Sequence, residues 1–262
     1  MIKADKFVKF IDRMKGMVKN MQSSVKIMGI DMLSNDVFIE KINEYLKDDK
    51  MDVILFASAD MINHAAEDDK YHEIIDKAEL FLPGEEALLT NYKVDMLEAG
   101  GMVVSCKSFG VMLENLWKQD RVIYIVADSE EDVENLRNYC KKNQPELKVA
   151  GDCVYSEEIE DAAIVNEINS CTPDILLVDL ESSIQEKWII EHVKLLNAKI
   201  CIAIGGVAGI IMAEEKKVPV WIEKIGLTKL YEKFAIERIP QKFMKAKFFS
   251  KRIDRYNTKN DQ

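Results

Sequence analysis

Glycine and proline are scarce in this 262-residue sequence, which holds 11 Gly and 5 Pro. So few turn-forming residues argue against long disordered linkers. No stretch reaches the ~18 uninterrupted apolar residues that a membrane-spanning helix needs. The opening MIKADKFVKF places charges where a signal peptide has an unbroken apolar core. The sequence therefore predicts a cytoplasmic protein.

Cysteine and histidine are also few and scattered. The 5 Cys include no C-x-x-C pair, and the 3 His lie far apart without the spacing of metal ligands. This pattern is typical of reduced, buried thiols and argues against a zinc site or a disulfide framework. We expect no metal and no cofactor.

Several nucleotide and hydrolase motifs are missing. There is no G-x-x-x-x-G-K-[ST] for a P-loop, no G-x-S-x-G for an α/β-hydrolase and no G-x-G-x-x-G for a dinucleotide. What is present is CIAIGGVAG, in which an apolar run ends at Gly205-Gly206. Such glycines either let a phosphate approach the backbone at the start of a helix or simply form a tight turn.

Charge is divided unevenly along the chain. Residues 1–24 carry six Lys/Arg against two Asp, and residues 238–262 carry eight Lys/Arg against two Asp, while the whole chain has a net charge of −10. An acidic body with two basic ends does not fit a nucleic-acid binder, whose basic surface is broad. It fits contact with an anionic membrane through the ends, or two solvated terminal helices.

Apolar runs alternate with helical patterns through most of the chain. Examples are DVILFAS, RVIYIVA and DILLVDL, each followed by a segment with helical periodicity. This order predicts an α/β, Rossmann-like fold with a mostly parallel sheet and helices on both faces. We expect an amphipathic N-terminal helix over 1–24, a Rossmann-like domain of catalytic type over 25–221, and a basic helical C-terminal appendage over 222–262.

Finer features of this pattern can also be predicted. Ser34 and Ser129 are expected to cap helices, and the helix after DVILFAS is expected to break near Asp68. GMVVSC, residues 101–106, is expected to be a strand. In DLESSIQEKW, Ser182 is expected to be an N-cap with Gln185 at the third helical position, forming a capping box.

Parallel sheets bind ligands beyond the carboxyl ends of their strands. Four loops occupy such positions, at 58–61, 83–86, 180–185 and 205–209. The loop that contains Gln185 either binds a ligand or only joins a strand to a helix.

Six segments in order resemble the WecG/TagA/CpsF glycosyltransferases. They are VKIMGIDMLSNDVFIEKINEYL, YHEIIDKAELFLPGEEAL, QPELKVAGD, PDILLVDLESSIQEKWI, NAKICIAIGGVAG and KVPVWIEKIGLTKLY, within residues 25–240. The resemblance implies inverting transfer of an N-acetylhexosamine-type sugar from a UDP-sugar to a polyprenyl-diphosphate-linked acceptor, for teichoic acid or capsule synthesis. It implies peripheral contact with the inner face of the bacterial cell membrane through the basic C-terminus, and no nucleic acid.

The same resemblance assigns residues. It implies Glu85 or Asp60 as the catalytic base, because Gly84 occupies the place of the family's Asp. It implies a substrate-binding set and a membrane-contacting pair: Ser182, Ser183, Gln185, Glu186, Gly205 and Gly206, then Arg252 and Arg255.

Departures from the family pattern leave the activity open. Phe56 and Ser58 stand in place of the family's Thr and Asn, and Ala208-Gly209 in place of its Phe-Asp. The family's Gly-x-Pro-Lys is replaced by residues 181–184, and its Tyr-Arg by Tyr231-Glu232, in addition to the change at Gly84. The chain is then an active transferase, a non-catalytic descendant that binds a nucleotide-sugar or a partner enzyme, or an unrelated α/β sensor.

Overall fold

The computed structural model describes residues 25–27, 30–85 and 105–213 of the chain. The expected helices over 1–24 and 222–262, with Arg252 and Arg255, lie outside the described residues. Within them, no helix is long and apolar enough to cross a membrane.

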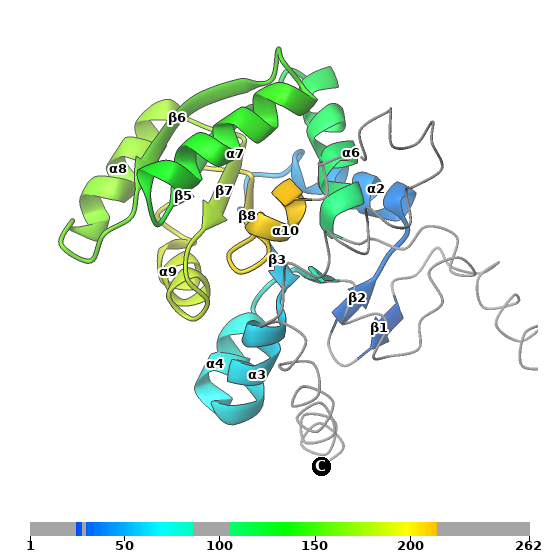
Figure 1. Ribbon diagram of the computed structural model, residues 1–262, viewed down its shortest axis with the longest axis vertical. Helices are drawn as coiled ribbons and strands as arrows, with labels where there is room; N and C mark the ends of the chain where they lie inside the picture. The colour runs from blue at the N-terminus through cyan, green and yellow to red at the C-terminus, as the bar shows by residue number, and fades with distance from the viewer. Residues whose placement is uncertain (1–24, 28–29, 86–104, 214–262) are drawn as a thin grey trace, which may run out of the picture.

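Strands and helices alternate along the described chain (Figure 1). The strands are β1 (Val25–Ile27), β2 (Ile30–Met32), β3 (Asp52–Ala57), β4 (Leu80–Pro83), β5 (Val122–Ala127), β6 (Lys148–Val154), β7 (Ile175–Asp179) and β8 (Ile200–Ala203). The helices are α2 (Asn35–Tyr45), α3 (Ala59–Glu67), α4 (Asp69–Ile75), α6 (Ser105–Lys118), α7 (Glu130–Asn143), α8 (Asp161–Cys171), α9 (Ile184–His192) and α10 (Ala208–Ala213).

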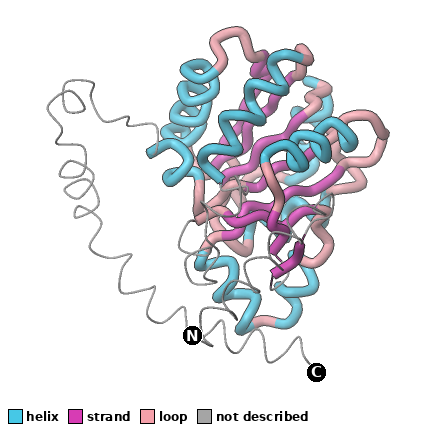
Figure 2. The backbone as a smooth tube through the Cα atoms, turned by 90° about the vertical axis from the view of Figure 1, so that its right-hand side faces the viewer, coloured by secondary structure: helices cyan, strands magenta, loops and turns pink. Residues whose placement is uncertain are grey.

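Six of these strands form one parallel sheet in the order β4-β3-β8-β7-β5-β6. β8, the last strand that the described residues form, lies at the centre between β3 and β7. Helices cover both faces (Figure 2). The α/β, Rossmann-like prediction is therefore confirmed.

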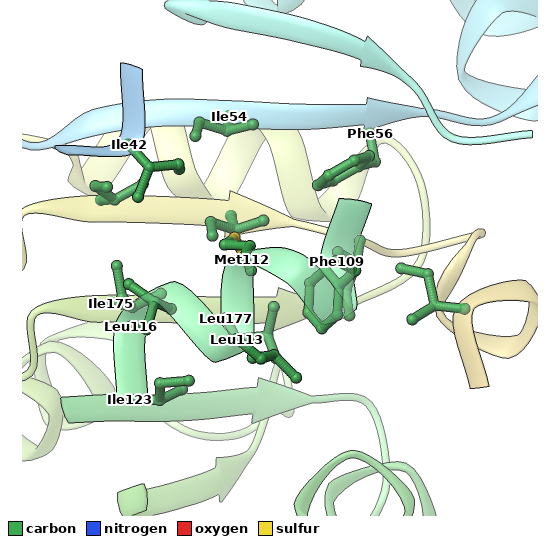
Figure 3. Packing of buried hydrophobic residues seen from close by; sticks show 14 of the residues in the cluster. Ile42, Ile54, Phe56, Phe109, Met112, Leu113, Leu116, Ile123, Ile175 and Leu177 are labelled. Carbon is green, nitrogen blue, oxygen red and sulfur yellow. The ribbon is translucent and has the colours of Figure 1, made fainter. Parts of the chain in front are cut away.

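The two faces of the sheet bury separate apolar layers. Val53 and Leu55 of β3 face α3, α4, α8 and α9, whereas Ile54 and Phe56 face α2, α6, α7 and α10. Figure 3 shows the second layer, where Ile54 and Phe56 lie close to Met112 of α6. Burying a side chain of this size contributes ~1.5–3 kcal/mol, so strands that are apolar on both faces are stable only inside such a sandwich.

A short hairpin lies beside one edge of the sheet. β1 and β2 pair antiparallel, and the carboxylate Oδ2 of Asp31 accepts a hydrogen bond from the Phe81 backbone N–H of β4 at 3.0 Å. The side chain of Asp31 is buried. A carboxylate thus occupies a backbone donor at the sheet edge, which blocks pairing with another strand there.

Most of the finer predictions are confirmed. Ser34 and Ser129 accept hydrogen bonds from backbone N–H groups at the starts of α2 and α7. Asp68 ends α3 and caps α4, as the expected break requires. The prediction of a strand over 101–106 is wrong at Ser105 and Cys106, which begin α6, because a short apolar run fits a buried helix as well as a strand. Residues 101–104 lie outside the described part.

Candidate functional site

At the carboxyl ends of β3, β7 and β8, the chain leaves the sheet toward different faces. β3 and β7 lead into α3 and α9 on one face, whereas β8 leads into α10 on the other face. The chain therefore turns in opposite directions on both sides of β8. In open parallel sheets, ligands bind in the crevice that such a switch creates.

The loop after β8, residues 204–207, is here called the glycine loop. A Cβ on Gly205 would lie 1.9 Å from the Leu180 carbonyl oxygen, so that only glycine fits beside the β7 end. Gly206 is exposed and has φ +81°, a conformation that glycine adopts without strain. Its absent Cβ would lie 3.1 Å from Ser58 Oγ and 3.4 Å from Ser182 Oγ. An exposed backbone segment thus lies between two serine hydroxyl groups from neighbouring strand ends.

The turn after β7, residues 180–183, is here called the serine turn. The N-cap of α9 is Ser183, and Glu186 stands at the third helical position and accepts the Ser183 backbone N–H at 2.7 Å. The prediction of Ser182 as N-cap with Gln185 as its partner is therefore wrong by one residue. Ser183 has φ +80°, which is strained for a residue with a Cβ.

Gln185 and Glu186 are both fully buried, at 0% exposure. The Gln185 Oε1 accepts the Gly205 N–H at 2.8 Å, and its Nε2 donates to Glu186 Oε1 at 2.7 Å. Glu186 Oε2 also accepts the hydroxyl of Tyr71 in α4 at 2.8 Å. These side chains connect the glycine loop, the serine turn and α4.

The expected catalytic carboxylates lie at the ends of β3 and β4. Glu85 Oε1 accepts the Ala59 N–H at the start of α3 at 3.0 Å. Asp60 is exposed in the first turn of the same helix. A Cβ on Gly84 would lie 2.5 Å from the Ala57 carbonyl oxygen and 2.7 Å from Val207 Cγ1. A side chain cannot be added at position 84 unless its neighbours move, and among the described residues of this loop Glu85 carries a carboxylate.

Acidic groups gather at the ends of β5 and β7, where Asp128, Asp132, Asp179 and Glu181 form what we call the acidic edge. Burial, together with the charges of Asp132 and Asp128, raises the pKa of Asp179 from 3.8 to about 7. Burial also raises the pKa of Asp128, which a backbone hydrogen bond from Glu181 partly offsets. Among the described residues, no three His, Cys, Asp or Glu side chains are placed to share a metal ion.

The structure thus brings all the predicted site residues that it describes together near the carboxyl ends of the strands. Sequence reasoning placed Ser58 in the loop 58–61 without assigning it a role, and it did not select the acidic edge. Tyr71 begins one of the segments that carry the resemblance, but its contact with Glu186, 115 residues away, could not be predicted from the sequence.

Comparison with known proteins decides the family. A family model described as "Glycosyl transferase WecG/TagA/CpsF family" matches residues 24–235, which include every described residue. The chain belongs to the WecG/TagA/CpsF glycosyltransferase family. It is also similar to N-acetylglucosaminyldiphosphoundecaprenol N-acetyl-beta-D-mannosaminyltransferase of Bacillus subtilis (strain 168), with 21% identity over 197 residues. That match covers 74% of this chain and 76% of the relative.

In this WecG/TagA/CpsF member, three of the segments that carry the resemblance meet at the carboxyl ends of the strands. The Pro83-Gly84 turn, the serine turn and the glycine loop come from three separate segments of the sequence, and the sheet order makes them neighbours. Because the family model matches, the interpretation as an unrelated α/β sensor is wrong.

Proposed function

We propose that this family member transfers an N-acetylhexosamine-type sugar from a UDP-sugar to a polyprenyl-diphosphate-linked acceptor. The observation that carries the proposal is the exposed Gly206 backbone between Ser58 and Ser182 at the switch point, with Glu85 beside it. The name of the Bacillus relative supports the acceptor and sugar classes. It includes a diphosphoundecaprenol-linked acceptor and an N-acetylmannosaminyl group.

The donor diphosphate is assigned to the glycine loop. Backbone N–H groups and serine hydroxyls donate hydrogen bonds to phosphate oxygens, and the N-termini of α3 and α9 favour an anion at the same edge. Ser58 and Ser182 would bind the diphosphate from its two sides. These groups stabilise the negative charge that develops on the leaving nucleoside diphosphate.

Glu85 is assigned as the general base of an inverting transfer. The acceptor hydroxyl oxygen bonds to the anomeric carbon, while the bond from that carbon to the diphosphate oxygen breaks and its electron pair leaves with UDP. The proton of the acceptor hydroxyl passes to the Glu85 carboxylate. The Ala59 N–H at 3.0 Å fixes one oxygen of Glu85, which orients the carboxylate at the start of α3.

Substitution of Glu85 by Gln tests this assignment. The Gln amide oxygen can still accept the Ala59 N–H, but the side chain cannot take up a proton, so the fold is kept and the base is lost. We expect UDP release with a prenyl-diphosphate-linked acceptor to fall ~10²–10⁴-fold. Asp60→Asn changes an exposed carboxylate in the first turn of α3. It is the matched control and should retain turnover. Full activity of Glu85→Gln with loss in Asp60→Asn would transfer the role of base to Asp60.

A second function, nucleotide-sugar binding without transfer, is favoured by two features of the site. Gly84 has no room for the carboxylate that the family resemblance implies there, and the acidic edge stands at the neighbouring strand ends. This function predicts thermal stabilisation by UDP without UDP release in any acceptor mixture. Measurable transfer by the unmodified chain would contradict it.

A further inference from the structure

Gln185 and Glu186, which the family resemblance marks as substrate contacts, have no side-chain atom left facing the site. Both are at 0% exposure, and their polar atoms hydrogen-bond to other groups of the protein. Gln185 Oε1 takes up N–H groups of the glycine loop and of Leu180, and its Nε2 faces Glu186. A ligand at Gly206 therefore reaches the loops and not these two side chains.

We propose that Tyr71, Gln185 and Glu186 are positioning residues that together hold the glycine loop and the serine turn in the form that binds the donor diphosphate. This unit is here called the clasp. The inference rests on the proposed function, which it deepens by assigning roles within the same site. It adds Tyr71, a residue of α4 to which the sequence assigned no role.

The contacts of Glu186 carry the argument. Its Oε1 accepts Gln185 Nε2 at 2.7 Å, and its Oε2 accepts both the Ser183 N–H at 2.7 Å and the Tyr71 hydroxyl at 2.8 Å. A carboxylate that accepts three short hydrogen bonds inside the protein ties the start of α9 to α4. The Tyr71 hydroxyl, from a residue at 5% exposure, anchors this carboxylate to α4.

Backbone strain at Ser183 shows that the clasp works against a local preference. A serine at φ +80° persists only where the surroundings determine its conformation. The Ser183 N–H is bound by Glu186 Oε2, so release of that contact lets the turn relax. Relaxation would move Ser182 away from Gly206, and the two sides of the diphosphate site would separate.

Tyr71→Phe is the primary test, because it removes only the hydroxyl. The matched control is Tyr124→Phe, since Tyr124 is also buried and its hydroxyl also donates to a carboxylate, Glu167 Oε1, at 2.8 Å. By titration calorimetry with UDP, we expect Tyr71→Phe to weaken binding about tenfold and Tyr124→Phe to leave it unchanged. Equal affinities for Tyr71→Phe and the unmodified chain, or equal losses in both variants, would overturn the inference.

A rescue experiment separates positioning from general stability. Glu186→Gln replaces one carboxylate oxygen, which accepts a hydrogen bond, by an amide nitrogen, which cannot. This variant should weaken UDP binding more than Tyr71→Phe does. Adding Ser183→Gly should recover part of that affinity, because glycine adopts φ +80° without a clasp. Adding Ser183→Ala, which keeps the Cβ, should recover none. Equal affinities of the two double variants would contradict the positioning role.

Hydrogen exchange keeps the clasp testable without any ligand. If the unmodified chain binds no UDP, the proposed function fails, but the clasp still predicts faster exchange of the Ser183 and Gly205 amides in Tyr71→Phe than in Tyr124→Phe. We expect about a tenfold difference at both amides. Unchanged exchange at both would refute the clasp independently of the ligand.

Discussion

The burial of Asp179 makes a sharp prediction about stability and pH. Its pKa is raised from 3.8 to about 7 by burial and by the charges of Asp132 and Asp128. Below pH 3.8 the carboxyl is protonated in both the folded and the unfolded chain and has no effect. Between pH 3.8 and about 7 the unfolded chain ionises first, so folding stability falls as pH rises, and above pH 7 the cost is constant.

Asp179→Asn removes this cost. Each pH unit of difference between the two pKa values corresponds to ~1.4 kcal/mol, which sets a ceiling of ~4 kcal/mol above pH 7. The side chain is not fully buried, so solvent screens part of this, and we expect a gain of about 2 kcal/mol in the free energy of unfolding at pH 8. At pH 5 the gain should be less than half as large, since most of the wild-type penalty is not yet present.

Urea unfolding followed by circular dichroism at pH 5 and pH 8 measures this difference. Glu134→Gln, which removes one carboxylate from an exposed position of α7, is the control for net charge and should change stability little at either pH. A gain for Asp179→Asn that is the same at both pH values, or a loss at pH 8, would refute the account of its raised pKa.

The remaining predictions concern the glycine loop and the C-terminus. Gly205→Ala should destabilise the fold by at least ~3 kcal/mol, because its Cβ would lie 1.9 Å from the Leu180 oxygen, whereas Gly209→Ala, with no atom within 4 Å, should stabilise it by ~0.5–1 kcal/mol. Thermal unfolding of both variants checks this pair, and similar melting temperatures would contradict it. If the membrane contact that the family resemblance implies is made by Arg252 and Arg255, Arg252→Glu with Arg255→Glu should reduce co-sedimentation with anionic phospholipid vesicles at low salt, and unchanged co-sedimentation would exclude these residues.

The sheet was predictable because its strands leave little ambiguity. DVILFAS and DILLVDL are apolar on both faces, which in a chain of this length fits a parallel sheet covered by helices. Helix starts marked by a serine after such a run were found at Ser34 and Ser129. The start of α9 was missed by one residue, because propensity places Ser182 and Ser183 equally well and the positive φ of Ser183 depends on Glu186.

The sequence predicted which segments lie close together, but not which groups their side chains contact. Motif order pointed to Gln185, Glu186 and the two glycines, and the structure places these at one edge of the sheet. Whether Gln185 faces a ligand or the protein depends on Gly205, which lies 20 residues away and becomes its neighbour only through the order of β7 and β8. The acidic edge has the same origin, because sequence does not say that β5 lies next to β7.

The close packing around Gly84 restricts which side chains can stand at that position. An Asp restored at position 84, where the family resemblance implies one, would meet the Ala57 carbonyl and the Val207 side chain at once. Shortening Val207 would relieve one contact and leave the backbone oxygen in place. A single substitution at position 84 therefore does not supply a carboxylate there unless the end of the strand moves as well.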